Sequence, residues 1–169
     1  MKLVIALFVA VIGTTMAAGQ ANAGTWTIPA AGCVPGDPAI QANRYLVTGG
    51  SVKHQSTATG VITLYCPITF ATLLTTGTLT FVVTFADSDG FSTAANVTAQ
   101  LIKLNSSNGV LTSIGSSLSS DAMAATTGGT MTTAFPHTIV ANDYYYVRVD
   151  INRTTTSQGA TFFGVRISG

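Results

Sequence analysis

Few residues of this sequence are suited to catalysis, because it has two histidines and no glutamate. His54 and His137 lie in unrelated segments, and no Gly-x-Ser-x-Gly motif or glycine-rich phosphate loop accompanies them. The many serines allow a Ser-His-Asp triad, but no spacing selects one, and no pair of aspartates stands out for glycoside hydrolysis. The sequence therefore predicts a non-catalytic protein, with a secreted hydrolase as the enzymatic alternative.

The segment Asp87-Ser88-Asp89-Gly90 has the alternating carboxylates with which many calcium loops begin, because Ca²⁺ binds several oxygens at short spacing. The rest of an EF-hand loop is missing, since Phe91 follows directly and the chain has no glutamate to close the loop. The same residues suit a turn between two strands, because Asp caps its own backbone and Gly accepts a positive φ. A turn is the favoured interpretation, and a calcium site at Asp87 and Asp89 is the alternative. No cofactor is expected.

The segment Tyr144–Ile151 has the cleanest two-residue period in the chain. Successive strand side chains point to opposite sides of a sheet, so this segment is predicted to be a strand with one buried and one exposed face. The buried face comprises Tyr145, Val147, Val149 and Ile151. The exposed face comprises Tyr144, Tyr146, Arg148 and Asp150.

A hairpin would join this strand to Ala160–Ser168 through the polar loop 153–159, with Phe163, Val165 and Ile167 facing inward. Its predicted register pairs Tyr146 with Arg166, Arg148 with Gly164, and Asp150 with Phe162. This register predicts one candidate surface with the following members: Tyr144, Tyr146, Arg148, Phe162 and Arg166. Aromatic rings beside polar groups suit stacking on sugars or burial against another protein subunit. Ordinary cross-strand packing is the favoured alternative.

The N-terminus has the three parts of a secretory signal peptide. Met1-Lys2 is a positive start, Leu3–Ile12 is an unbroken apolar run, and Ala21-Asn22-Ala23 is a small-x-small cleavage site. The apolar run is too short to span a bilayer, so no membrane span is expected. We expect cleavage after Ala23 and a secreted protein, located in the periplasm, at the cell surface or outside the cell.

Cys33 and Cys66 are the only cysteines. An even pair in an exported chain most simply forms one disulfide. Lipidation of Cys33 and a free reactive thiol are the alternatives, although Cys33 follows Pro29 and lies far beyond the apolar run.

Residues 24–169 have the length of one domain with a real core. The chain carries seven Lys and Arg against six acidic residues, which gives a formal net charge of +1 and no basic surface for nucleic acid. Abundant Thr and Val, together with turn signals every eight to twelve residues, predict about eight to ten short strands. The least patterned segment, Gly115–Gly129, is predicted to be a long loop with at most one short strand. The fold class is therefore all-β, an antiparallel β-sandwich of jelly-roll or immunoglobulin-like type.

An early cysteine followed by a second at the end of the strand-like segment Gly60-Val-Ile-Thr-Leu-Tyr-Cys66 resembles bacterial chaperone–usher pilins and spore-coat U-like subunits. The resemblance covers Cys33 to about Cys66 and implies an assembling subunit. Such subunits have an alternating apolar donor segment at the N-terminus, whereas Gly24–Gly32 is short and interrupted by Pro29.

The sequence thus predicts an exported structural or adhesion-type cell-envelope protein that acts through its surface. The alternatives are a carbohydrate-binding module with an exposed aromatic and arginine face, a pilin-like subunit, and a hydrolase. Its ligand is not identified by any motif, and a glycan or another protein subunit is the expected partner.

Overall fold

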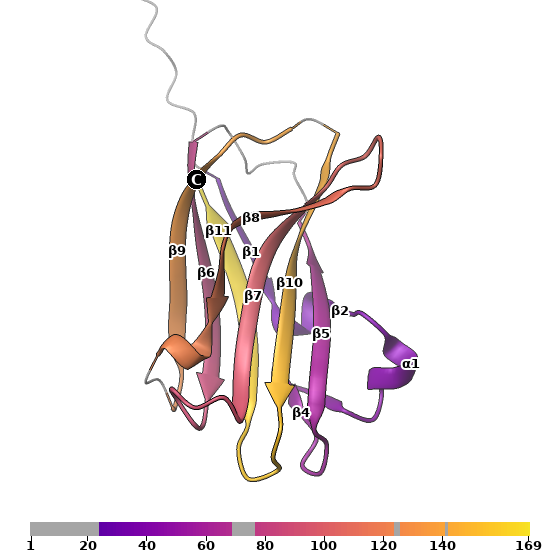
Figure 1. Cartoon of the computed structure of the whole chain (residues 1–169), viewed down its shortest axis with the longest axis vertical. Coiled ribbons are helices and arrows are strands. Elements are labelled where there is room, and N and C mark those ends of the chain that lie inside the picture. The colour runs from indigo at the N-terminus through magenta and orange to yellow at the C-terminus, as the bar shows by residue number, and fades with distance from the viewer. Residues whose placement is uncertain (1–23, 69–76, 124–125, 141) are drawn as a thin grey trace, which may run out of the picture.

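The computed structural model describes residues 24–68, 77–123, 126–140 and 142–169. These residues form almost entirely β-structure, arranged as two antiparallel sheets packed face to face (Figure 1). The predicted antiparallel β-sandwich is therefore confirmed. The predicted signal peptide, residues 1–23, lies outside the described residues. None of the helices in the described ranges is long and apolar enough to cross a membrane.

Sheet A contains six strands among the described residues, in the order β3-β4-β11-β6-β9, with β1 also paired to β11. Its strands are β1 (Thr25–Pro29), β3 (Tyr45–Thr48), β4 (Ser51–His54), β6 (Gly77–Asp87), β9 (Gly129–His137) and β11 (Ala160–Ser168). The centre of the sheet is β11, which pairs with β6 along one edge and with β1 and β4 along the other. The first and the last strand of the described chain therefore lie side by side.

Sheet B contains five strands in the described chain, in the order β2-β5-β10-β7-β8. Its strands are β2 (Val34–Pro35), β5 (Gly60–Pro67), β7 (Ala95–Leu104), β8 (Leu111–Ser119) and β10 (Tyr144–Arg153). The strand β10 lies between β5 and β7 and pairs with both over nearly its whole length (Figure 1).

The inner faces of the two sheets form one hydrophobic core. The predicted inward face of β10 is confirmed, because Tyr145, Val147, Val149 and Ile151 are all buried. From sheet A, Phe81 and Phe85 of β6 and Phe162 of β11 are the largest fully buried side chains. A two-residue period therefore identified the buried face of β10 correctly.

The predicted hairpin between β10 and β11 is wrong, because these strands belong to different sheets. The loop after β10 instead crosses from sheet B to sheet A, a distance of about 10 Å between stacked sheets. The guanidinium group of buried Arg153 holds this crossing by donating hydrogen bonds to the carbonyl oxygens of Gln55, Thr155 and Thr156. Chain crossings from sheet to sheet also join β5 to β6, β6 to β7, β8 to β9 and β9 to β10, which is typical of the jelly-roll type of sandwich.

The inward face of β11 differs from the prediction at one residue. Val165 and Ile167 are buried as predicted, but Phe162 is fully buried and Phe163 is 42% exposed. The cause is a register shift between Phe162 and Gly164 in the pairing with β6, which reverses the sides to which the preceding side chains point.

The segment predicted as a long loop, Gly115–Gly129, is more ordered than expected. Strand β8 continues to Ser119, a short 3₁₀ helix, η2 (Ser120–Ala122), follows, and residues 124–125 lie outside the described residues. Two other short helices, η1 (Ala30–Gly32) and α1 (Pro38–Gln41), lie in the segment before β3. The sequence signal for α1 was present, because Asp37 caps it by accepting from Ala39 and Ile40 and Pro38 takes its first position.

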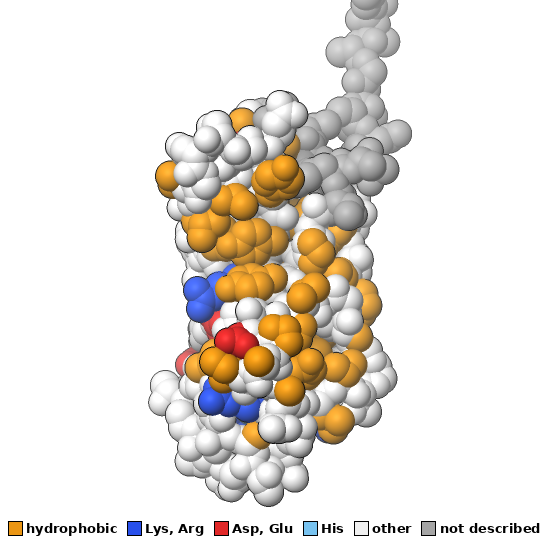
Figure 2. Space-filling view, turned by 90° about the vertical axis from the view of Figure 1, so that its right-hand side faces the viewer, with side chains coloured by type: hydrophobic (Ala, Val, Ile, Leu, Met, Phe, Trp, Pro, Cys, Tyr) orange, Lys and Arg blue, Asp and Glu red, His pale blue; other side chains and the backbone are white. Residues whose placement is uncertain are grey.

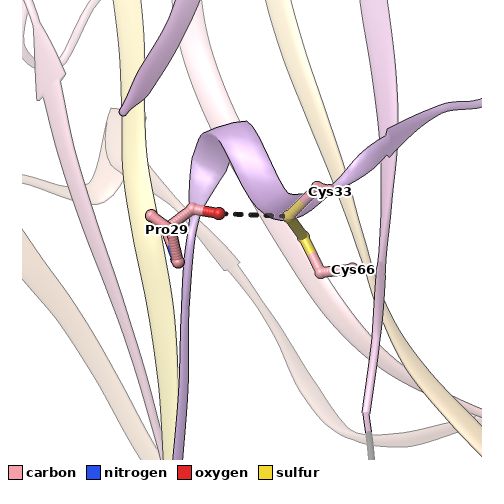
Figure 3. The surroundings of a disulfide bond; sticks show 3 residues. All are labelled: Pro29, Cys33 and Cys66. Atoms are coloured by element: carbon pink, nitrogen blue, oxygen red, sulfur yellow. Dashed lines mark hydrogen bonds between the residues drawn. A yellow bond between two sulfur atoms is a disulfide. The ribbon is translucent and has the colours of Figure 1, made fainter. Parts of the chain in front are cut away.

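The predicted disulfide is confirmed between Cys33, which follows η1, and Cys66 of β5 (Figure 3). It joins residues 33 positions apart and fixes the point where the chain passes from β1 of sheet A to β2 of sheet B. The carbonyl oxygen of Pro29 lies 3.9 Å from the sulfur of Cys33. Because a disulfide sulfur carries no proton, this approach is a packing contact and not a hydrogen bond.

Candidate functional site

The structure separates the five residues of the predicted surface. Tyr144, Tyr146 and Arg148 lie on the outer face of sheet B, whereas Arg166 belongs to β11 of sheet A. Phe162 is in the core, so the predicted grouping of it with the tyrosines is wrong. The neighbours of Tyr146 and Arg148 come instead from β5 and β7, the two strands that pair with β10.

The outer face of sheet B is hollowed at its β5 side by an apolar depression of about 390 Å³. We call it the aromatic hollow; its lining residues are Val34, Tyr65, Pro67 and Tyr146. The rings of Tyr65 and Tyr146 meet edge to face, with centroids 5.4 Å apart and planes at 88°. Edge-to-face pairs are modestly stabilising, so each ring supports the orientation of the other in the unliganded fold.

A second depression of about 210 Å³ lies on the β7 and β8 side of the same face. We call it the polar hollow; its polar lining residues are Thr98, Gln100, Ser113, Ser117, Arg148 and Asp150. The two hollows adjoin at β10, because Tyr146 and Arg148 are two residues apart and point to the same side of the strand.

The charged groups of the polar hollow neutralise each other. Arg148 Nε lies 2.9 Å from Asp150 Oδ2, and the hydroxyl of Thr63 donates to Asp150 Oδ1 at 2.6 Å. The side chain of Arg148 is nevertheless 51% exposed, so its guanidinium group also faces solvent. The amide of Gln100 is fixed by donating to the carbonyl oxygens of Ile114 and Gly115.

Hydrophobic side chains gather on this side of the molecule. Figure 2 looks at the side that carries β2 and β5 and shows hydrophobic side chains along much of its height, with a few basic and acidic groups among them and at the left margin. Val34 and Tyr65 contribute to this surface, with exposures of 55% and 38%. An exposed apolar surface rimmed by polar groups is typical of a binding site.

Sequence reasoning missed three residues that line the aromatic hollow with Tyr146, namely Val34, Tyr65 and Pro67. It also missed Gln100, which lines the polar hollow. Tyr65 lies on the outward side of its strand, but nothing in the sequence indicated that β5 lies beside β10. Strand order depends on packing between residues that are far apart in the sequence. A local sequence pattern therefore could not show that Tyr65 of β5 packs against Tyr146.

The Asp87–Gly90 segment forms the turn that the sequence favoured. Asp87 Oδ1 accepts from the backbone nitrogen of Asp89 at 3.4 Å, and Gly90 has a φ of 62°. The hydroxyl of Ser120 donates to Asp87 Oδ2, and the backbone nitrogen of Ala95 donates to Asp89 Oδ2. Both carboxylates are thus used by the fold, and the described part of the chain contains no group of three or more His, Cys, Asp or Glu arranged to hold a metal ion.

Burial raises the pKa of Asp87 to about 7, and its contact with the carboxylate of Asp89 adds to the rise. The folded state therefore binds this proton more tightly than the unfolded chain does. The resulting stabilisation is full at pH values below the unfolded pKa and is lost as the pH rises through about 7.

We expect Asp87→Asn to weaken this pH dependence, because an amide still accepts from Ser120 but does not titrate. Thermal melts between about pH 5 and pH 8 should show that the wild type loses stability relative to the variant as the pH rises. His54 and His137, whose pKa values burial lowers, act in the opposite direction in this range but are common to both proteins. Parallel melting profiles for the two proteins would contradict the assignment.

The two histidines are used structurally and do not form a catalytic group with a carboxylate in the described structure. The ring of His54 shares a hydrogen bond with the carbonyl oxygen of Gly60, and the ring of His137 with the hydroxyl of Tyr145. They lie on β4 and at the end of β9.

In sequence, the chain matches no protein-family model and no curated protein. In structure, it is similar to the CBM36-1 domain of a multidomain xylanase from the hindgut metagenome of Trinervitermes trinervoides. The two are 10% identical, with a TM-score of 0.50 over 86% of this chain and 98% of that domain. This likeness establishes a shared β-sandwich fold and nothing further.

Two other solved structures are less similar. One is the carbohydrate-binding module CBM36 in complex with calcium and xylotriose, 14% identical, with a TM-score of 0.46 over 83% of this chain and 97% of that one. The other is a family two carbohydrate esterase from Cellvibrio japonicus, 15% identical, with a TM-score of 0.42 over 87% of this chain. The present chain spans 34% of that esterase.

Proposed function

We propose that this protein is an exported, non-catalytic β-sandwich that binds carbohydrate through the outer face of sheet B. The observation that carries the proposal is the edge-to-face pair of Tyr65 and Tyr146 in an open apolar hollow beside hydrogen-bonding groups. Sugar rings present apolar faces and polar edges, and this combination matches them. The fold shared with a domain that is named as a carbohydrate-binding module is compatible with the proposal.

This proposal replaces the structural or adhesion-type role as the first hypothesis, because it accounts for the aromatic hollow. The pilin-like alternative receives less support. The segment that donor-strand assembly would give to a neighbouring subunit is β1, and β1 pairs with β11 of the same chain. Export remains part of the proposal, and the buried disulfide is compatible with an oxidising compartment.

We expect Tyr65→Ala and Tyr146→Ala each to weaken polysaccharide binding about tenfold or more, because each removes one wall of the aromatic hollow. Affinity electrophoresis in gels that contain soluble plant or bacterial polysaccharides measures this effect. Phe163→Ala is a matched control, since Phe163 is an exposed aromatic residue of sheet A and should not affect binding. Unchanged retardation of both tyrosine variants, or no retardation of the wild type by any polysaccharide, would contradict the proposal.

A further inference from the structure

The aromatic and polar hollows form one continuous surface that runs across the strands of sheet B. Tyr65 on β5 lies opposite Arg148 on β10, and Arg148 lies opposite Gln100 on β7. Residues directly opposite each other in paired strands point to the same side of the sheet. This row therefore places a lining residue of the aromatic hollow next to two lining residues of the polar hollow.

We propose that this surface binds an uncharged oligosaccharide chain that crosses the strands, with one part on the tyrosines and another in the polar hollow. This inference rests on the proposed function and specifies its ligand. The four strands from β5 to β8 span roughly 14 Å at the usual spacing of about 4.8 Å. A single sugar ring covers only one of the two hollows, so contact with both requires several linked sugars.

The charge balance of the polar hollow favours an uncharged oligosaccharide over an acidic one. Arg148 is its only cation and is paired with Asp150, so the lining carries no net charge. A sugar carboxylate that approached Arg148 would also meet the carboxylate of Asp150. Hydroxyl groups both donate and accept, and they find donors on Arg148 and acceptors on Asp150 in the same place.

The polar groups are also held in position before binding. Thr63 and Arg148 fix the two carboxylate oxygens of Asp150, and backbone carbonyl oxygens of β8 fix the amide of Gln100. Groups that are already ordered lose little conformational entropy on binding, which favours affinity for an uncharged polar ligand such as a glycan.

Isothermal titration calorimetry with the full chain tests the inference. The probes are cello-, xylo- and manno-oligosaccharides from the monosaccharide to the hexasaccharide, with oligogalacturonates as the acidic series. We expect the affinity for at least one neutral series to rise about tenfold or more from the monosaccharide to a chain that covers both hollows. That affinity should change little between about 20 and about 300 mM NaCl, because no net charge is matched.

Two variants locate the second contact. Gln100→Ala should weaken binding of the long neutral chain several-fold and leave the shortest ligand that binds unaffected, while Tyr146→Ala should weaken both. Asp150→Asn leaves Arg148 unpaired and should shift the preference toward oligogalacturonate. Arg166→Ala on sheet A is the control. It should change neither the affinity for the neutral chains nor the preference between neutral chains and oligogalacturonate.

The outcomes separate this inference from the proposed function. Neutral binding that does not depend on chain length, or tighter salt-sensitive binding of oligogalacturonate by the wild type, overturns the inference and leaves glycan binding intact. Absence of binding to every glycan overturns both.

Discussion

Replacing both cysteines by alanine, Cys33→Ala with Cys66→Ala, is expected to lower the free energy of unfolding by about 3–4 kcal/mol. The disulfide joins residues 33 positions apart, so it removes much of the freedom that the unfolded chain would otherwise gain. Both cysteines are buried, and alanine avoids placing an unpaired hydroxyl group in the core. Urea-induced unfolding of the oxidised wild type and of the double variant measures the difference.

The same change should also weaken glycan binding under conditions where the variant is folded. Two residues that line the aromatic hollow, Val34 and Pro67, directly follow the two cysteines, and Tyr65 directly precedes Cys66. The two-residue strand β2 has only a short pairing with β5 to hold it without the disulfide. Equal unfolding free energies for the two proteins would show that the bond contributes nothing to the stability of this fold.

Phe162→Ala is expected to lower the free energy of unfolding by about 3–5 kcal/mol, because it opens a cavity in the core. The adjacent Phe163→Ala should lower it by only about 1–1.5 kcal/mol, since the side chain of Phe163 is 42% exposed and its removal opens no cavity in the core. Chemical denaturation of the two variants provides a matched pair, because the same atoms are removed one residue apart.

The pair also tests the register shift in β11. A regular strand that buries Phe163, Val165 and Ile167, as the alternating pattern predicted, would give the opposite ranking. The larger loss at Phe162 is therefore the result that only the shifted register explains.

The period-two pattern predicted the buried face of β10 correctly, because burial on one side of a sheet leaves a local trace in the sequence. It did not predict which strands pair. The pattern of β11 is the same whether it lies beside β10 or faces it across the core, and a seven-residue loop is long enough for either arrangement. The outward direction of Tyr144, Tyr146 and Arg148 on β10 was therefore predicted correctly, whereas the predicted contribution of β11 to the same surface was wrong.

One signal for the misplaced phenylalanine was present in the sequence. A glycine inside a strand pattern often marks a bulge or a close backbone approach, and Gly164 follows Phe163 directly. A side chain at this position would place its Cβ 2.7 Å from the carbonyl oxygen of Ile28 in β1. Glycine is thus required where β1 passes closest to β11, and the irregularity in β11 occurs at the same place.

The pairing of β1 with β11 determines when the fold of this domain can be completed during its synthesis. Thr25–Pro29 emerge first among the described strands, whereas their partner, Ala160–Ser168, emerges last. The strands β4 and β6 also pair with β11, which lies between them in sheet A. Until the residues of β11 have been synthesised, the apolar inner face of sheet A remains exposed and prone to aggregation. Sheet A of this domain can therefore be completed only after the residues of β11 have been synthesised.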